Sequence, residues 1–314
     1  MLSNDFLIFA GSSNLSLAKK IVKNLGKELG VLESKRFSDG EIWVKYGENI
    51  RGREVFIIQS TNPPADNVLE LLIMLDAAKR ASASRITAVI PYFGYSRQDR
   101  KDQPRVSITA KLMANLIIEA GADRVMTMDL HASQIQGFFD IPFDHLYGSS
   151  VFINHVTSLS DNLAVVSPDI GGIKVARAYS KMLDASFVVI DKRRLTHNKA
   201  EVMNIIGEVE GKDILLVDDL IDTAGTFVGA IKSLKDKGAQ RIFGVATHPL
   251  LSGPAIERLN ESALELLLVT DTIKIDENVS KKIKVITASD LFAEALLRTF
   301  NNESISSLFN VDKG

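Results

Sequence analysis

Residues 214–226 decide the fold, and they read Ile214-Leu215-Leu216-Val217-Asp218-Asp219-Leu220-Ile221-Asp222-Thr223-Ala224-Gly225-Thr226. The apolar run at the start predicts a buried strand. Two carboxylates, Asp218 and Asp219, follow where this strand is expected to end, and a turn of small residues then opens a helix. Open α/β sheets bind their ligands at the carboxyl ends of the strands. The stretch therefore predicts an α/β fold with a binding site at the start of this helix.

The turn Thr223–Thr226 is suited to holding a phosphate. Its backbone N–H groups and the positive end of the helix dipole would point at one spot. The two threonine hydroxyls add donors, and Gly225 lets the backbone approach a ligand closely. Asp218 and Asp219 can accept hydrogen bonds from sugar hydroxyls or support a metal ion. An ordinary helix capped by Asp222 or Thr223 is the alternative, but it accounts for one polar residue only.

Outward from this stretch, short apolar runs alternate with amphipathic helical patterns. Helices are predicted over Ser107–Ala120, capped by Ser107 and ended by Gly121, and over Phe227–Lys237, ended by Gly238. We expect the apolar face of the first of these helices to comprise Ile108, Leu112, Met113, Leu116 and Ile117. The predicted strands are Phe6–Ala10, Val55–Gln59, Ile86–Pro91, Val125–Asp129, Leu163–Ser167, Phe187–Ile190, Ile214–Val217, Ile242–Ala246 and Leu264–Val269. The alternation predicts mainly parallel sheets covered by helices on both faces.

A length of 314 residues exceeds what one hydrophobic core usually serves, so two domains are expected. A weak repeat agrees with this expectation. Gly121–Val125 and Gly238–Ile242 read alike, and each is followed by a histidine, His131 or His248, ten residues after its glycine. We therefore expect two copies of one α/β domain, over residues 1–147 and 148–314, with the last helix a candidate to pack on the first domain.

Composition excludes several classes of protein. The net charge of −2 argues against bulk nucleic-acid binding, and the absence of cysteine removes disulfides and thiolate chemistry. We find no signal peptide and no run of about 20 apolar residues, so we expect no membrane contact and a cytoplasmic protein. The glycine-rich fingerprints of dinucleotide and P-loop sites are also missing.

Other polar segments follow predicted strands. Arg97–Lys101 carries clustered cations that suit a polyphosphate, although alone it would more often be a solvated loop. Phe37, Asp39 and Glu41 precede Trp43 in an alternating stretch that could form a hairpin, with Phe37 a stacking face for an adenine. Asp191–Arg194 leaves a predicted strand into a polar stretch, and its three adjacent cations by themselves fit a solvated tip.

His131 and Asp169 each come directly after a predicted strand. Such a histidine is otherwise more often a local hydrogen-bonding residue. Asp129 could orient it as an acceptor. His145, His155 and His197 receive no functional assignment.

In order along essentially the whole chain, these segments resemble ribose-phosphate pyrophosphokinase (phosphoribosyl diphosphate synthase) of class I. Residues 214–226 are also similar to the corresponding loop of type I phosphoribosyltransferases, which have one such domain. The remaining segments that carry the resemblance are Phe37–Glu41, Pro91–Lys101, Asp129–Ala132, Gln134–Phe139, Ser167–Asp169, Asp191–Arg194, Thr247–Pro249 and Ser252–Pro254.

The resemblance implies two tandem type I phosphoribosyltransferase-like domains, with ATP contacts in the first and a ribose 5-phosphate loop in the second. It implies transfer of the β,γ-diphosphoryl group of MgATP to the C1 hydroxyl of ribose 5-phosphate, giving phosphoribosyl diphosphate and AMP. It also implies a homo-oligomer, usually a hexamer, whose hairpin reaches a neighbouring subunit's ATP site. A non-catalytic regulatory paralogue and a phosphoribosyltransferase stay as alternatives.

Residue roles come from the same resemblance. Lys192 and Arg194 would stabilise the transferring group from a mobile loop, and His131 and Asp169 would lie around Mg²⁺. The implied ATP-binding residues are Phe37, Asp39, Gly40, Glu41, Arg97, Gln98 and Asp99. The implied ribose 5-phosphate-binding residues are Arg194, Asp218, Asp219, Asp222, Thr223, Ala224, Gly225 and Thr226.

Overall fold

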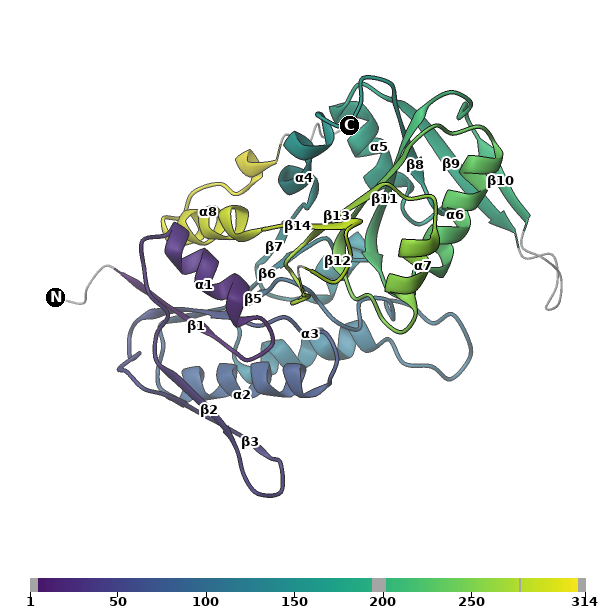
Figure 1. Cartoon of the computed structure of the whole chain (residues 1–314). Helices are drawn as coiled ribbons and strands as arrows, with labels where there is room; N and C mark the ends of the chain where they lie inside the picture. The colour runs from purple at the N-terminus through teal and green to yellow at the C-terminus, as the bar shows by residue number, and fades with distance from the viewer. Residues whose placement is uncertain (1–4, 194–201, 277, 310–314) are drawn as a thin grey trace. The chain divides into compact units, whose positions relative to one another are not determined.

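A computed structural model describes residues 5–193, 202–276 and 278–309. The chain divides into two compact units (Figure 1). The first comprises the chain up to Tyr147, the short segment Thr272–Lys274 and the residues from Thr287 onward. The second comprises Gly148–Asp271 and Ile275–Ile286. The predicted α/β class with mainly parallel sheets is confirmed for both units.

The first unit is built on a five-stranded parallel sheet in the order β1-β4-β5-β6-β7. Its strands are β1 (Phe6–Ala10), β4 (Glu54–Ile58), β5 (Arg85–Ile90), β6 (Arg124–Met128) and β7 (Phe143–Leu146). Alternate residues along each strand face opposite sides, so both faces need covering. Helices α2 (Asp66–Arg80) and α3 (Thr109–Ala120) pack on one face. A short 3₁₀ helix, η1 (Ser133–Phe138), follows β6.

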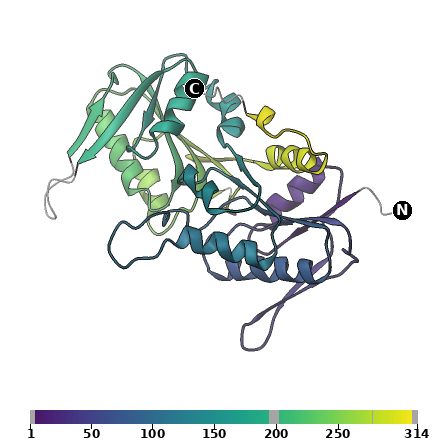
Figure 2. The ribbon, with the colours of Figure 1, turned by 180° about the vertical axis from the view of Figure 1, so that it is seen from behind.

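The other face of this sheet is covered by a helix from the far end of the sequence. Phe300, at the end of α8 (Ser289–Phe300), packs its ring 4.7 Å from that of Phe6, which lies 5.2 Å from Phe56. Helix α8 lies beside α1 (Leu15–Asn24), where Asn24 Nδ2 donates to Ser289 Oγ at 3.0 Å (Figures 1 and 2). The short helix η2 (Ser306–Leu308) ends the described chain near α8.

A two-stranded hairpin projects from the first unit (Figure 1). It consists of β2 (Leu32–Arg36) and β3 (Ile42–Tyr46), which pair antiparallel. The predicted hairpin is thus confirmed, and Phe37, Asp39 and Glu41 lie in its tip.

The second unit contains a seven-stranded sheet in the order β10-β9-β8-β11-β12-β13-β14. All neighbours are parallel except β10, which is antiparallel to β9. Helices α6 and α7 cover one face and α4 and α5 the other. The strands are β8 (Leu163–Ser167), β9 (Ser186–Arg193), β10 (Val202–Ile206), β11 (Asp213–Ile221), β12 (Ile242–Pro249), β13 (Leu266–Thr270) and β14 (Ile283–Ile286). The helices are α4 (Ser149–Val156), α5 (Ile173–Met182), α6 (Gly225–Asp236) and α7 (Ala255–Glu261).

Two local predictions about α3 are wrong. The helix begins after Ile108, and no side chain caps it, because the Ser107 hydroxyl contacts Thr109 Oγ1 instead. The expected apolar face is only partly buried: Ile117 is 1% exposed, but Leu112 is 49% exposed. The small residues Ala110 and Ala114 face the core instead, because α3 lies close against α2 and the sheet.

The two copies of the sequence repeat have the same backbone conformation at their glycines, but their histidines lie in different structural positions. Gly121 and Gly238 both have positive φ and both separate a helix from a parallel strand, as expected where only glycine turns freely. His131, however, lies exposed after β6, whereas His248 is buried within β12. Equal spacing therefore does not place the two histidines in equivalent positions.

An ion pair joins the starts of β11 and β12. Asp213 accepts hydrogen bonds from Arg241 Nε at 3.1 Å and from the Arg241 backbone N–H at 3.2 Å. Hydrogen bonding to Arg241 lowers the pKa of Asp213 to about 2. The ion pair therefore stabilises the folded state fully at pH values above 3.8, the ordinary pKa of an aspartate, and this stabilisation is lost as pH falls towards about 2.

We expect Asp213→Asn to lower the free energy of unfolding at neutral pH by about 1 kcal/mol, a value reduced for solvent screening of the half-exposed Arg241. Urea unfolding at a series of pH values measures this, and the deficit should shrink as pH falls from 3.8 towards about 2. Asp236→Asn, at the exposed end of α6, serves as the control. A deficit that stays constant over this range would contradict the role of the ionised carboxylate.

No helix in the described part of the chain is both long enough and apolar enough to cross a bilayer.

Candidate functional site

The loop between β11 and α6 forms the core of the candidate site in the second unit. Its left-handed residue is Ala224, with φ 59°, rather than Gly225. A Cβ added to Gly225 would lie 3.5 Å from Arg258 Nη1 and 3.9 Å from Thr223 Oγ1, which are ordinary contacts. The protein itself therefore does not require glycine at this position, and the space beside Gly225 is open to a ligand.

Backbone N–H groups of this loop are available at the start of α6. Thr223, Gly225 and Thr226 are exposed, and no acceptor within the described residues bonds their N–H groups. Arg258 Nη1 donates to the Thr223 carbonyl at 2.9 Å, which ties this loop to α7. Arg258 lies on α7 and was not singled out by the sequence, because nothing in the sequence links α7 to this loop. The arrangement fits an anion at the helix start.

Carboxylates concentrate beside the loop. Asp218 and Asp219 lie near the carboxyl end of β11, and Asp218 Oδ1 accepts from the Asp219 backbone N–H at 2.9 Å. Burial raises the pKa of Asp218 well above its ordinary value, and the charges of Asp219 and Asp169 raise it further. Asp219 on β11 and Asp169 in the turn after β8 are thus close enough to Asp218 to disfavour its ionised form.

Asp169 lies in the turn between β8 and α5. Its Oδ1 accepts from the Gly172 backbone N–H at 3.0 Å, and Ser167 Oγ donates to its carbonyl at 2.7 Å. Within the described residues, no group of three or more acidic or histidine side chains converges tightly enough to enclose a metal ion. The donor set nevertheless fits Mg²⁺, which prefers oxygen ligands and commonly binds through one or two carboxylates, waters and substrate phosphates.

The cationic loop predicted to act on the transferring group is only partly described. Lys192 lies near the end of β9, where its backbone pairs with Met203 of β10. Arg194 lies outside the described residues, as do the seven residues after it. Asp191 precedes Lys192 on the same strand and is half-buried.

The first unit brings two predicted segments together. The loop carrying Arg97, Gln98 and Asp99 follows β5, and the loop carrying His131 follows the adjacent strand β6. Gln134 Nε2, in η1, donates to Asp99 Oδ2 at 2.9 Å and so joins the two loops. Arg97 and Gln98 are exposed beside this contact.

His145 supports the loop that carries His131, although no role was predicted for it. His145 lies on β7, opposite Thr127 of β6, and its Nε2 accepts the Leu130 backbone N–H at 3.0 Å. Because Leu130 directly precedes His131, this bond fixes the backbone at the point where His131 emerges. Strand pairing between β6 and β7 creates this contact, and the sequence contains no signal for that pairing.

Gly94 is the tightest point of the loop that leads to Arg97. A Cβ at Gly94 would lie 2.1 Å from the Thr61 backbone oxygen, and Thr61 Oγ1 accepts the Gly94 N–H at 2.7 Å. We expect Gly94→Ala to lower the free energy of unfolding by about 2 kcal/mol through overpacking. Thermal or urea unfolding measures this. Gly137→Ala is a matched control, because nothing lies within 4 Å of a Cβ there. Equal stabilities for the two variants would contradict the clash.

The hairpin tip presents the remaining predicted residues. Phe37 is 56% exposed, its N–H donates to the Glu41 carbonyl at 2.9 Å, and Gly40 has φ 98°. Asp39 Oδ1 accepts the Glu41 N–H at 3.1 Å. The tip is therefore an ordered turn that holds an exposed aromatic ring and two carboxylates.

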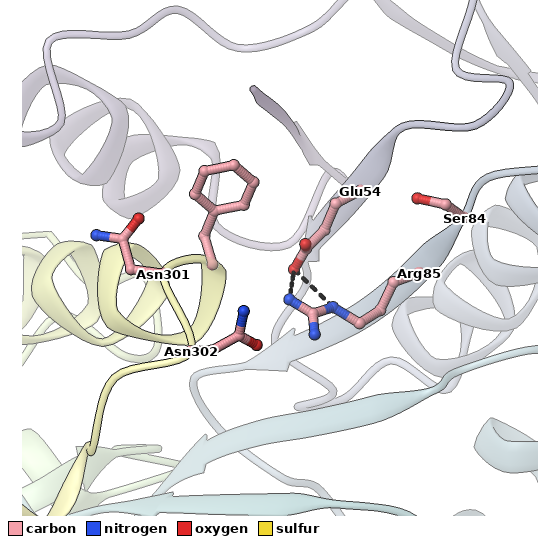
Figure 3. A pocket seen from close by; sticks show the side chains of 6 residues that line it. Glu54, Ser84, Arg85, Asn301 and Asn302 are labelled. Carbon is pink, nitrogen blue, oxygen red and sulfur yellow. Dashed lines mark hydrogen bonds and ion pairs between the residues drawn. The ribbon is translucent and has the colours of Figure 1, made fainter. Parts of the chain in front are cut away.

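A cavity of about 560 Å³ lies elsewhere in the first unit (Figure 3). Glu54 and Arg85, the first residues of β4 and β5, line it together with Ser84, Asn301 and Asn302. It therefore lies at the amino ends of the parallel strands, opposite the edge that carries Arg97 and His131. Arg85 donates to Glu54 from Nε at 2.8 Å and from Nη2 at 2.6 Å, so the cavity offers no uncompensated charge for a phosphate.

Fold and site together define an α/β protein of the open-sheet class, with polar ligand-binding loops at the carboxyl ends of its parallel strands. The family model for the N-terminal domain of ribose phosphate pyrophosphokinase matches residues 6–121, and the model for the phosphoribosyl synthetase-associated domain matches residues 178–310. The chain belongs to the ribose-phosphate pyrophosphokinase family.

Comparison with individual relatives supports the same family. The ribose-phosphate pyrophosphokinase of Chlorobaculum tepidum is 60% identical over 96% of this chain and 94% of its own length. That of Campylobacter jejuni is 54% identical over 97% of this chain and 99% of its own. The crystal structure of phosphoribosylpyrophosphate synthetase from Mycobacterium smegmatis superposes with a TM-score of 0.90 at 37% identity, covering 95% of this chain and 99% of that one.

Proposed function

We propose that this chain transfers the β,γ-diphosphoryl group of ATP to the C1 hydroxyl of ribose 5-phosphate, giving phosphoribosyl diphosphate and AMP. The observation that carries the proposal is the β11–α6 loop, where available backbone N–H groups lie directly after the Asp218–Asp219 pair. A phosphate and the hydroxyls of one sugar need this combination of donors and acceptors. Membership of the ribose-phosphate pyrophosphokinase family supports the same reaction.

The second unit is proposed to hold ribose 5-phosphate. Its 5-phosphate accepts the N–H groups of Thr223–Thr226, and Asp218 and Asp219 accept hydrogen bonds from the ribose hydroxyls. Asp222 and Ala224 shape the turn. Lys192 and Arg194 stabilise negative charge on the transferring group.

The first unit is proposed to hold ATP. As the resemblance implies, the hairpin tip reaches the ATP of a neighbouring subunit. There Phe37 stacks on the adenine, the carboxylates of Asp39 and Glu41 accept hydrogen bonds from its amino group, and Gly40 provides the turn between them. Arg97, Gln98 and Asp99 lie along the polyphosphate. No enzyme nucleophile is needed, because the C1 hydroxyl itself attacks the β-phosphorus once the reactants are held in line.

Asp169 in the second unit and His131 in the first are each proposed to contact Mg²⁺, with Asp169 the better ligand because Mg²⁺ prefers oxygen. Bound Mg²⁺ would neutralise charge on the diphosphoryl group. Burial is the main cause of the raised pKa of Asp218, and the further increase caused by the charges of Asp219 and Asp169 would be relieved by a cation bound nearby. Hexameric assembly stays a prediction from the resemblance, and cytoplasmic location stays a prediction from the sequence.

One assay tests the reaction against its alternatives. The purified chain is incubated with MgATP, with and without ribose 5-phosphate, and AMP is measured. We expect AMP release that depends on ribose 5-phosphate. Absence of AMP, with base-dependent release of diphosphate from phosphoribosyl diphosphate, would favour a phosphoribosyltransferase. Absence of both activities would favour a regulatory paralogue.

A further inference from the structure

Glu70, on α2, is a buried carboxylate without a role in the reaction described above. It is 3% exposed, and the donors around it are hydroxyl, amide and backbone groups rather than cations. Ser12 donates to Oε2 from its N–H at 3.1 Å and from its hydroxyl at 2.5 Å, and Gln59 Nε2 donates to the same oxygen at 2.8 Å. Ser34 Oγ donates to Oε1 at 2.8 Å. One carboxylate thus joins β2 to the end of β4 and to the loop after β1.

The bond to Ser34 is the middle one of three that tie the hairpin to α2. Arg36 Nη2 donates to Asp66 Oδ2 at 2.8 Å, one helical turn before Glu70. Tyr46 Oη donates to the Met74 carbonyl at 2.8 Å, one turn after it. Burial raises the pKa of the Tyr46 hydroxyl, so it stays protonated and can donate.

The three bonds are spaced to match the two elements. Asp66, Glu70 and Met74 are four residues apart on one helix face, a rise of about 6 Å per step. Their partners are Arg36, Ser34 and Tyr46, and Tyr46 is paired with Leu32. The partners are therefore two strand residues apart, about 6.7 Å per step. The spacing of the three positions on α2 is therefore close to the spacing of their partners on the hairpin. Because of this match all three bonds can form at once, and together they set the direction of the hairpin along α2.

The tip of the hairpin is linked to one of the three bonds between the hairpin and α2. Arg36, besides contacting Asp66, donates from Nη1 to the Gly40 carbonyl at 3.0 Å. Gly40 forms part of the turn that presents Phe37. A two-stranded hairpin is marginally stable by itself in water, so the position of its tip depends on what holds its strands. Here α2 holds them.

We propose that Glu70 is a positioning residue that, through Ser34, holds the β2–β3 hairpin on α2 and so places Phe37 against the adenine of ATP. The inference rests on the proposed function, in which Phe37 contacts ATP. Glu70 itself is buried and acts on ATP only through the hairpin.

The hairpin contains a natural fluorescent probe. Trp43 is the single tryptophan of the chain and lies on β3, opposite Lys35 of β2. Its fluorescence therefore reports on the hairpin alone, without any need for activity. Acrylamide quenching and anisotropy of Trp43 measure how firmly the hairpin is held.

Ser34→Ala is the main test, because it removes one hydroxyl and leaves Glu70 with its other donors. We expect the KM for ATP to rise about fivefold, with kcat and the KM for ribose 5-phosphate unchanged, and Trp43 to become more mobile. Ser34→Thr keeps the hydroxyl and should restore both values. Glu70→Gln should loosen the hairpin further, with its thermal unfolding measured alongside. Lys45→Ala, exposed on β3 and not part of the three bonds, is the control.

An unchanged KM for ATP in Ser34→Ala would overturn the proposal, whether or not Trp43 became more mobile. Failure of the proposed function is recognised separately, because the wild-type chain would then release no AMP. In that case, calorimetric titration with a non-hydrolysable ATP analogue tests the positioning role without any need for activity. Weaker binding by Ser34→Ala than by Ser34→Thr supports the positioning role, and equal binding overturns it.

Discussion

Lys192→Ala should lower kcat by about 10²-fold or more while the fold survives. The magnitude is that of removing one charge-stabilising donor from a transferring group. Lys192 is expected to act on charge that develops in the transition state, so the KM values for both substrates should change little. Its backbone lies at the end of the β9–β10 pair, away from the centre of the sheet, so truncation of its side chain should not unfold the second unit. Steady-state measurement of AMP release gives kcat and both KM values.

Lys181→Ala is the matched control, because Lys181 is an exposed lysine in the last turn of α5 in the same unit. It should retain wild-type kcat. Circular dichroism and thermal unfolding of both variants separate a catalytic loss from misfolding. Turnover near that of the wild type in Lys192→Ala would remove Lys192 from the mechanism.

Gly225→Val should raise the KM for ribose 5-phosphate by about 10²-fold, the second large effect. A branched side chain at Gly225 would occupy the space where the 5-phosphate meets the N–H groups, and each lost hydrogen bond to a charged group costs about 1.5–3 kcal/mol. An added Cβ meets only Arg258 Nη1 at 3.5 Å and Thr223 Oγ1 at 3.9 Å. The protein should therefore accept the substitution, and the loss should fall on the ligand.

Calorimetric titration with ribose 5-phosphate and thermal unfolding test this together. Gly225→Ala should show an intermediate loss of affinity, about tenfold, with a melting temperature close to that of the wild type. Affinity for an ATP analogue should be unchanged in both variants and serves as the internal control. Undiminished affinity for ribose 5-phosphate in Gly225→Val would show that the phosphate binds elsewhere.

Much of the fold followed from local sequence. Strands β1 and β8 have the predicted bounds, and the alternation of strands and helices led directly to mainly parallel sheets. Strands β7, β10 and β14 were missed, because they are short or lie at sheet edges and carry weak apolar patterns. The apolar face of α3 was misjudged because helical periodicity alone cannot distinguish the side that meets α2 from the side left exposed, as Leu112 shows.

For the candidate site, the sequence by itself determined the chemistry of the loops. It placed Asp218 and Asp219 near the carboxyl end of a strand and the small-residue turn after them, since both features depend on neighbours along the chain. The predicted strand end at Val217 was wrong, because β11 includes both aspartates and continues to Ile221. Only the tertiary structure decided which residues support those loops. Arg258 donates to the Thr223 carbonyl, His145 accepts the backbone N–H just before His131, and Glu70 joins α2 to Ser34 of the hairpin. The physical reason is distance along the chain: these partners are 15 to 36 residues apart in sequence, and strand pairing and helix packing alone bring them within hydrogen-bonding distance.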